Sequence, residues 1–126
     1  MDSEKEKKAW RKVTYKQKFS NAFRGMYVAF KVTSHSFIHI IATFIVIAFG
    51  LYFKISSIEW TLLVFAIGFV IVSEMINTAI EIDIDLTSPD YHPYARDTKD
   101  VAAGAVLLSL FVAIIVGLII FLPKIL

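Results

Sequence analysis

The chain has 126 residues, enough for one domain, and 57% of them are hydrophobic. Its mean hydropathy of +0.67 is too high for an ordinary soluble domain of this length, so the composition predicts a membrane protein. There is no cysteine, which excludes disulfides and thiolate metal sites. The net charge of +2 hides a segregation, because nine of the thirteen basic residues lie within the first 31 positions.

Residues 1–12 are rich in charges of both signs and predict a flexible basic N-terminus. Because apolar segments follow this arm, we expect it to meet anionic lipid rather than nucleic acid. The apolar runs begin only near Phe37, and no small-residue cleavage pattern precedes them. This arrangement argues against a cleavable signal peptide.

Residues 13–34 show helical periodicity. Apolar and aromatic side chains recur on one face, at Phe19, Phe23, Met26, Tyr27 and Phe30, and the basic residues mostly fall elsewhere. The pattern predicts an amphipathic surface helix whose lysines reach the lipid headgroups. The same aromatic stripe could also pack on the protein's own helices, and both interpretations can hold together.

Three apolar segments, 36–53, 58–82 and 99–122, predict three transmembrane helices. The first has 18 residues, near the minimum for about 30 Å of hydrocarbon at 1.5 Å per residue. Trp60 is placed as an interfacial anchor of the second segment. Small residues at 102–105 suit close helix contact in the third.

The boundaries of these segments follow from breaking and capping residues. Pro89 and Pro93 predict a loop over residues 83–97, because proline interrupts helices. Asp97 or Thr98 would then cap the third membrane helix, and Pro123 would end it.

Charge sets the expected orientation. The N-terminal arm and the second loop are basic, whereas the other side carries only Lys54 and Lys124. The positive-inside rule therefore predicts a multi-pass plasma-membrane protein whose N-terminus and second loop face the cytoplasm.

Acidic residues concentrate in the second half, where seven of the eleven lie between positions 74 and 100. Glu74, Asn77, Glu81 and Asp85 are spaced i, i+3, i+7 and i+11, which places them on one helical face. A charge at the depth of Glu74 costs about 2.5–3.5 kcal/mol on insertion scales, so it normally faces a partner, a cavity or a metal. We expect a chemical site at the cytoplasmic mouth of the protein.

These residue types suit phosphoryl transfer. Carboxylates such as that of Glu81 are ligands for magnesium, Lys99 can approach a phosphate, and Glu74 can accept the proton of a lipid hydroxyl. Three alternatives stay open: Glu74 and Asn77 as a structural polar pair, a solvated acidic loop, and an ion path or transporter. No glycine-rich phosphate loop exists.

Two histidines, His35 and His39, are spaced i and i+4 at the start of the first apolar segment and could bind a metal together. No third ligand is evident in the sequence nearby. The alternative is that they are hydrogen-bonded or interfacial histidines.

A specific combination of residues resembles a known family. It comprises Glu74-x-x-Asn77-Thr78-Ala79-Ile80-Glu81 with Asp85, then Tyr91-His92, then Lys99-Asp100 followed by Ala102-Ala103-Gly104-Ala105-Val106. It resembles the prokaryotic integral-membrane diacylglycerol kinases, particularly their undecaprenol kinase branch, over residues 15–126. The resemblance implies an all-α, single-domain protein of residues 1–126. It also implies a homotrimer with active sites between subunits, and transfer of phosphate from ATP with magnesium to a lipid alcohol.

The resemblance also implies residue roles. Glu74 matches the catalytic base and Glu81 a metal-binding carboxylate, while Asn77 and Asp85 match supporting polar residues. The segment expected to contact ATP comprises Asp90, Tyr91, His92, Lys99 and Asp100. One position departs from the family, because Thr33 stands where a second metal-binding glutamate is expected. The implied reaction converts undecaprenol to undecaprenyl phosphate. The alternatives are a diacylglycerol kinase that makes phosphatidic acid, and a lipid-binding homologue weakened by Thr33.

Overall fold

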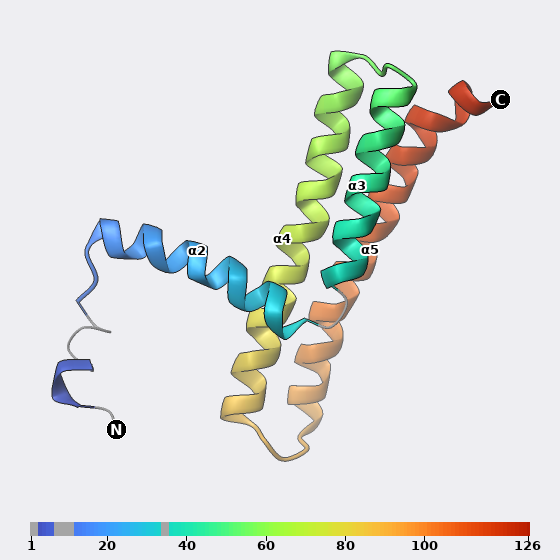
Figure 1. Cartoon of the computed structure of the whole chain (residues 1–126). Helices are drawn as coiled ribbons and strands as arrows, with labels where there is room; N and C mark the ends of the chain where they lie inside the picture. The colour runs from blue at the N-terminus through green and yellow to red at the C-terminus, as the bar shows by residue number, and fades with distance from the viewer. Residues whose placement is uncertain (1–2, 7–11, 34–35) are drawn as a thin grey trace.

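The computed structural model describes residues 3–6, 12–33 and 36–126. In this part of the chain every regular element is helical and no strand occurs. The long helices are α2 (Tyr15–Val32), α3 (Ser36–Tyr52), α4 (Ser57–Thr87) and α5 (Pro93–Ile125). Helices α3, α4 and α5 run side by side, and α2 projects sideways from the middle of this bundle (Figure 1).

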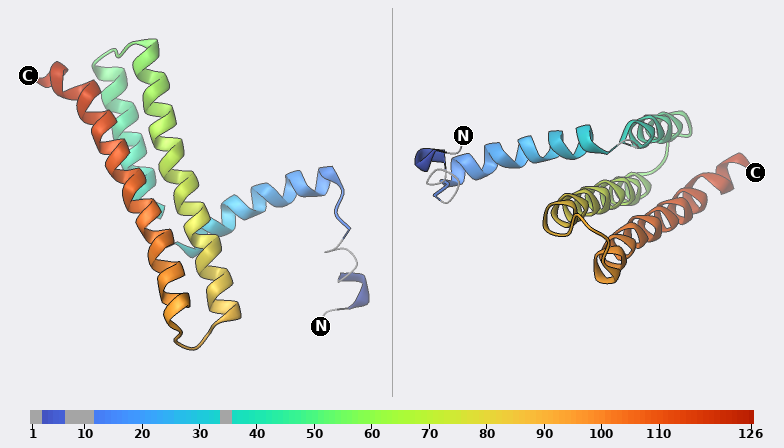
Figure 2. Two further views of the ribbon diagram at one scale, coloured as in Figure 1. Left: turned by 180° about the vertical axis from the view of Figure 1, so that it is seen from behind. Right: turned by 90° about the horizontal axis from the view of Figure 1, so that it is seen from below.

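The three bundled helices alternate in direction. The α3–α4 turn and the C-terminus lie at one end, and the α4–α5 turn lies at the other (Figure 1). Seen from below, α4 lies between α3 and α5 (Figure 2). Helix α4 packs most extensively against α5. The core sits near the α3–α4 turn, where Ile55, Leu63 and Ile120 are buried together.

Most apolar side chains outside this core are exposed. Phe65, Leu108 and Ile119 expose 74%, 63% and 67% of their surface. Apolar surface on this scale needs lipid or another protein surface to cover it. The single chain is therefore suited to a membrane or to an assembly within one.

Length and apolar composition identify two helices that could cross a membrane, α4 and α5, and up to three if the bent pair of α2 and α3 counts as one span. Helix α3 by itself has 17 residues. At 1.5 Å per residue it is about 26 Å long, slightly shorter than about 30 Å of hydrocarbon. Three separate crossings therefore remain a prediction.

Local capping explains where α2 begins and ends, close to the predicted limits of 13–34. Thr14 and Gln17 form a reciprocal capping box at its start. At its end, the Thr33 amide donates to the carbonyl of Ala29. Of the predicted aromatic stripe, Phe19, Phe23 and Tyr27 are exposed by 59–70%.

The predicted loop over residues 83–97 is wrong in extent. Helix α4 continues to Thr87, and α5 begins at Pro93, so only residues 88–92 connect them. Pro93 does not break the helix because it occupies the first turn, where its missing N–H has no partner to lose. His92, rather than Asp97 or Thr98, caps α5 by accepting the Tyr94 amide at Nδ1.

Helices α4 and α5 also exceed the predicted segments at the opposite end of the bundle. A capping box between Ser56 and Glu59 starts α4. Pro123 lies inside α5, which continues to Ile125, so the expectation that it ends the helix is wrong. Because Pro123 lies within the last turn of α5, it removes only one of the last backbone hydrogen bonds of the helix. Lys124 Nζ then reaches Glu59 Oε2 at 2.7 Å and joins the two helix ends.

Candidate active site

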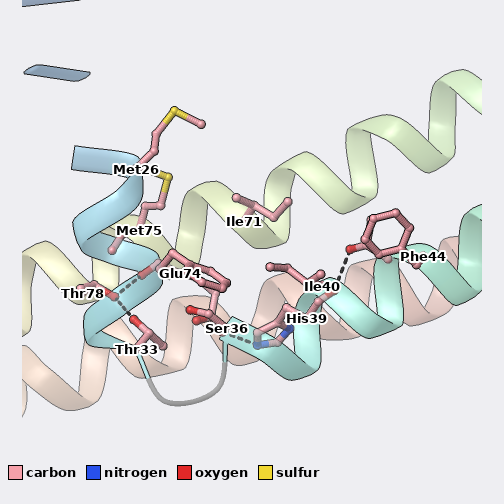
Figure 3. Close-up of a pocket in the computed structure, with 13 residues that line it drawn as sticks. Met26, Thr33, Ser36, His39, Ile40, Phe44, Ile71, Glu74, Met75 and Thr78 are labelled. Carbon is pink, nitrogen blue, oxygen red and sulfur yellow. Dashed lines mark hydrogen bonds and ion pairs between the residues drawn. The ribbon is translucent and has the colours of Figure 1, made fainter. Parts of the chain in front are cut away.

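A pocket of about 300 Å³ lies where α2, α3 and α4 meet. Its wall is mainly apolar, and its polar side chains come from α3, from α4 and from Thr33, the residue that caps the end of α2 (Figure 3). The lining residues are Met26, Ala29, Phe30, Thr33, Ser36, His39, Ile40, Thr43, Phe44, Ile71, Glu74, Met75 and Thr78. A concave apolar site with a few convergent polar groups is typical of a small-molecule or lipid pocket.

Glu74 supplies the carboxylate of this pocket. Its Oε1 lies 2.7 Å from Nε2 of His39, and the two side chains expose only 18% and 24% of their surface. The contact joins α3 to α4 and points both side chains toward each other (Figure 3). Glu74 is thus partnered and faces a cavity, as its depth in the apolar sequence predicted.

Thr33 and Thr78 link the end of α2 to α4 on the same side of the pocket. Their hydroxyl oxygens are 2.7 Å apart, and the Thr78 hydroxyl donates to the Glu74 carbonyl at 3.0 Å. Because Thr78 gives its single proton to that carbonyl, Thr33 is the donor between the two hydroxyls. Thr33 therefore contacts Thr78 at the position where the family resemblance expects a metal carboxylate.

Asn77 and Glu81 form the next polar pair along α4. Asn77 Nδ2 donates to Glu81 Oε1 at 3.3 Å, which orients the amide and the carboxylate together. The amide oxygen of Asn77 is buried and has no hydrogen-bond partner. A buried oxygen without a partner is unusual and marks a place where a cation or donor would be stabilised.

Magnesium fits this pair only with help from a substrate. Across residues 3–6, 12–33 and 36–126, no three histidine or acidic side chains gather as a ready-made metal site. Magnesium often binds through one or two carboxylates together with phosphate oxygens and water. The carboxylate of Glu81 and the unpartnered amide oxygen of Asn77 are suitable hard ligands for such an arrangement.

A second pocket, of about 250 Å³, lies at the α4–α5 turn. Asp85 and Lys99 face each other across it, with Lys99 Nζ 2.6 Å from Asp85 Oδ1. The expected nucleotide-contacting residues Asp90, Tyr91, His92, Lys99 and Asp100 all line this pocket. The turn thus gathers every residue of that set at one end of the bundle.

Within one chain the two pockets are separate, and they share no lining residue among those described. Glu81 lies about 10 Å along the helix axis from Glu74, and Asp85 about 16 Å, at 1.5 Å per residue. Glu74, Asn77 and Glu81 are therefore neighbours along α4, whereas Lys99 approaches Asp85 instead.

Sequence reasoning missed the partners of Glu74 in the pocket. His39 is a hydrogen-bonded histidine, and it pairs with Glu74 rather than with a second histidine. His35 lies outside the described residues, so the idea of a histidine metal pair stays untested. The available signal was the rule that ionisable groups in apolar helices tend to pair with one another. That rule does not say which of two histidines is the partner.

An apolar pocket with one partly buried carboxylate, beside a helix long enough to cross a membrane, is typical of a membrane protein that binds an amphiphile. Comparison with known sequences makes the class specific. The chain belongs to the prokaryotic diacylglycerol kinase family, whose sequence pattern matches residues 20–121. It is thus a member of a family of lipid kinases, enzymes that catalyse phosphoryl transfer in a membrane setting.

Individual relatives agree with this membership. The chain is 38% identical over 106 residues to an undecaprenol kinase of Bacillus subtilis (strain 168), covering 84% of this chain and 86% of that protein. It is 36% identical over 109 residues to a diacylglycerol kinase of Synechocystis, covering 86% of this chain and 62% of the relative. A diacylglycerol kinase of Escherichia coli (strain K12) is 28% identical over 75 residues, which covers 60% of this chain and 62% of that protein.

Proposed function

We propose that this protein transfers the γ-phosphate of ATP to the hydroxyl of undecaprenol and releases undecaprenyl phosphate and ADP. The observation that carries the proposal is the Glu74 carboxylate, which lies in an apolar pocket suited to a lipid chain. A relative of similar length that is named an undecaprenol kinase supports the choice of lipid.

The hydrogen bonding of the pocket favours undecaprenol over diacylglycerol. Four hydroxyls line the pocket. Those of Thr33, Thr43 and Thr78 already donate their protons to protein oxygens, and of the four only the Ser36 hydroxyl has no partner among the described residues. Diacylglycerol carries ester carbonyls beside its hydroxyl, and buried acceptors without donors cost about 1–3 kcal/mol each. One free donor cannot satisfy two ester carbonyls, whereas a prenol carries one hydroxyl on a hydrocarbon chain, which suits an apolar wall with one carboxylate and one free hydroxyl.

In the proposed reaction, the lipid oxygen attacks the γ-phosphorus while Glu74 takes the hydroxyl proton. A new phosphorus–oxygen bond forms to the lipid, and the bond between the γ-phosphorus and the oxygen of ADP breaks. Lys99 provides positive charge to the phosphates in the second pocket, beside Asp90, Tyr91, His92 and Asp100. When bound through Glu81 and Asn77, magnesium would neutralise charge on the phosphate oxygens.

A homotrimer with shared active sites would explain how the separate pockets cooperate. Lys99 of one subunit could then serve Glu74 and Glu81 of a neighbour, as the family resemblance implies. The extensive apolar exposure of the single chain supports an assembly within a membrane. The basic N-terminal arm favours the bacterial plasma membrane with the N-terminus in the cytoplasm.

The decisive experiment measures phosphate transfer from radiolabelled MgATP to undecaprenol in detergent micelles, with diacylglycerol as the competing substrate. Glu74→Gln should lower the rate at least 100-fold, because general-base catalysis commonly contributes 10²–10⁴-fold. Glu59→Gln is the matched control: it is the same change on the same helix, in another ion-paired glutamate at the opposite end. If Glu74→Gln stays within a few-fold of the wild type, Glu74 is not the base.

One observation favours a second candidate, a lipid-binding homologue with weakened catalysis. The Thr33 hydroxyl is hydrogen-bonded to Thr78, and a threonine cannot supply a second carboxylate to a metal held by Glu81. Folded wild-type protein without turnover above background would support this alternative. Thr33→Glu provides a further test, because a large gain in rate would show that a missing metal carboxylate limits the enzyme.

A further inference from the structure

His39 lies next to the proposed base, Glu74, but has no role in the reaction described above. It comes from α3, opposite Glu74 on α4, and its Nε2 lies 2.7 Å from Glu74 Oε1. The Thr43 hydroxyl donates to the backbone carbonyl of His39 at 2.7 Å. Both His39 and Thr43 line the apolar pocket with Glu74, and Figure 3 shows the His39 and Glu74 side chains next to each other.

The contact occupies one oxygen of the carboxylate and leaves the other one available. Among the described residues, Glu74 Oε2 makes no hydrogen bond or ion pair. A carboxylate held at one oxygen cannot rotate freely, and a short nitrogen–oxygen contact of this kind is a strong, charge-assisted hydrogen bond. The second oxygen is then fixed for a hydroxyl that enters the pocket.

We propose that His39 is a positioning residue for Glu74, and that its Nε2–H orients the carboxylate so that Oε2 receives the proton of the lipid hydroxyl. The inference rests on the proposed function, because it assigns His39 to the same transfer. A base oriented by a third group is a recurring arrangement in enzymes that activate a hydroxyl. Misplacing a reacting group by about 1 Å can cost about 100-fold in rate, so orientation by one hydrogen bond matters.

The competing interpretation is that the contact only ties α3 to α4. A structural tie and an orienting bond predict different kinetics. Loss of a tie should lower thermal stability or raise the KM for lipid through a deformed pocket. Loss of orientation should lower kcat and leave the KM for lipid nearly unchanged.

The test compares His39→Leu, which removes the donor, with His39→Gln, which keeps an N–H group within reach. We expect His39→Leu to lower kcat about 10- to 100-fold with the KM for undecaprenol within two-fold. His39→Gln should restore at least a third of the wild-type kcat. Ile40→Ala, the adjacent pocket residue that is not bonded to Glu74, should change KM more than kcat.

A double variant separates this inference from the proposed function. In a Glu74→Gln background, His39→Leu should lower the residual rate less than two-fold, because there is no longer a base to orient. If Glu74→Gln abolishes transfer and both His39 variants keep the wild-type kcat, the positioning role is refuted and the proposed function stands. If Glu74→Gln keeps the wild-type rate, the assignment of the base fails first. Equal losses for His39→Leu in both backgrounds would show that the contact is only structural.

Discussion

The hydrogen bond between Thr33 and Thr78 gives a quantitative prediction about how α2 is held on the bundle. The oxygens are 2.7 Å apart, the usual length of a good hydroxyl–hydroxyl bond. Thr78 is only 3% exposed, and Thr33 is half-buried. Valine has the same shape as threonine without the hydroxyl, so Thr33→Val and Thr78→Val remove the bond with little change in packing.

Thr78→Val leaves the Thr33 hydroxyl without its acceptor and also removes the bond to the Glu74 carbonyl, so it should lower the unfolding free energy by about 1–3 kcal/mol. Thr33→Val leaves Thr78 bonded to that carbonyl and should cost only about 0.5–1.5 kcal/mol. The double variant removes both groups, so its loss should fall short of the sum of the two single losses by about 1 kcal/mol. Unfolding by sodium dodecyl sulfate in mixed micelles, followed by circular dichroism at fixed protein concentration, measures these values. Thr61→Val is the control, because the Thr61 hydroxyl bonds only within α4, to the Ser57 carbonyl. Additive losses within 0.3 kcal/mol, the usual agreement for independent sites, would refute the reasoning.

Three further substitutions test other parts of the molecule. Lys99→Met should lower the transfer rate at least 10-fold and barely change the melting temperature, since an exposed ion pair contributes little stability; an unchanged rate over an ATP titration would remove Lys99 from the site. Gly50→Ala should destabilise the fold by about 1–3 kcal/mol, because a Cβ there would lie 2.6 Å from the Trp60 ring. Gly68→Ala, where nothing lies within 4 Å, is the control, and equal melting temperatures for the two variants would contradict the packing explanation. Lys54→Gly should stabilise the α3–α4 turn by about 0.5–1 kcal/mol, because Lys54 has a φ of 51° in the left-handed region; a lower melting temperature would show that this backbone is not strained.

Sequence alone determined the helical, apolar nature of the protein and the face that carries its chemistry. Period and hydropathy depend on neighbouring residues, so the four helices and the common face of Glu74, Asn77 and Glu81 could be predicted from spacing. The departure at Thr33 rests on the family resemblance and stays a prediction. Helix ends could be predicted less well. A proline such as Pro93 is compatible with a helix start and incompatible with a helix interior, and the sequence does not say which of the two applies.

Tertiary structure decided which distant side chains meet. Nothing in local spacing says that His39 will face Glu74, or that Thr33 will donate to Thr78 across 45 positions of chain. Those contacts depend on how α2, α3 and α4 cross. The pocket exists only because three helices leave space at their junction. Local sequence therefore fixes the elements and their faces, whereas packing between helices selects the partners of the candidate base.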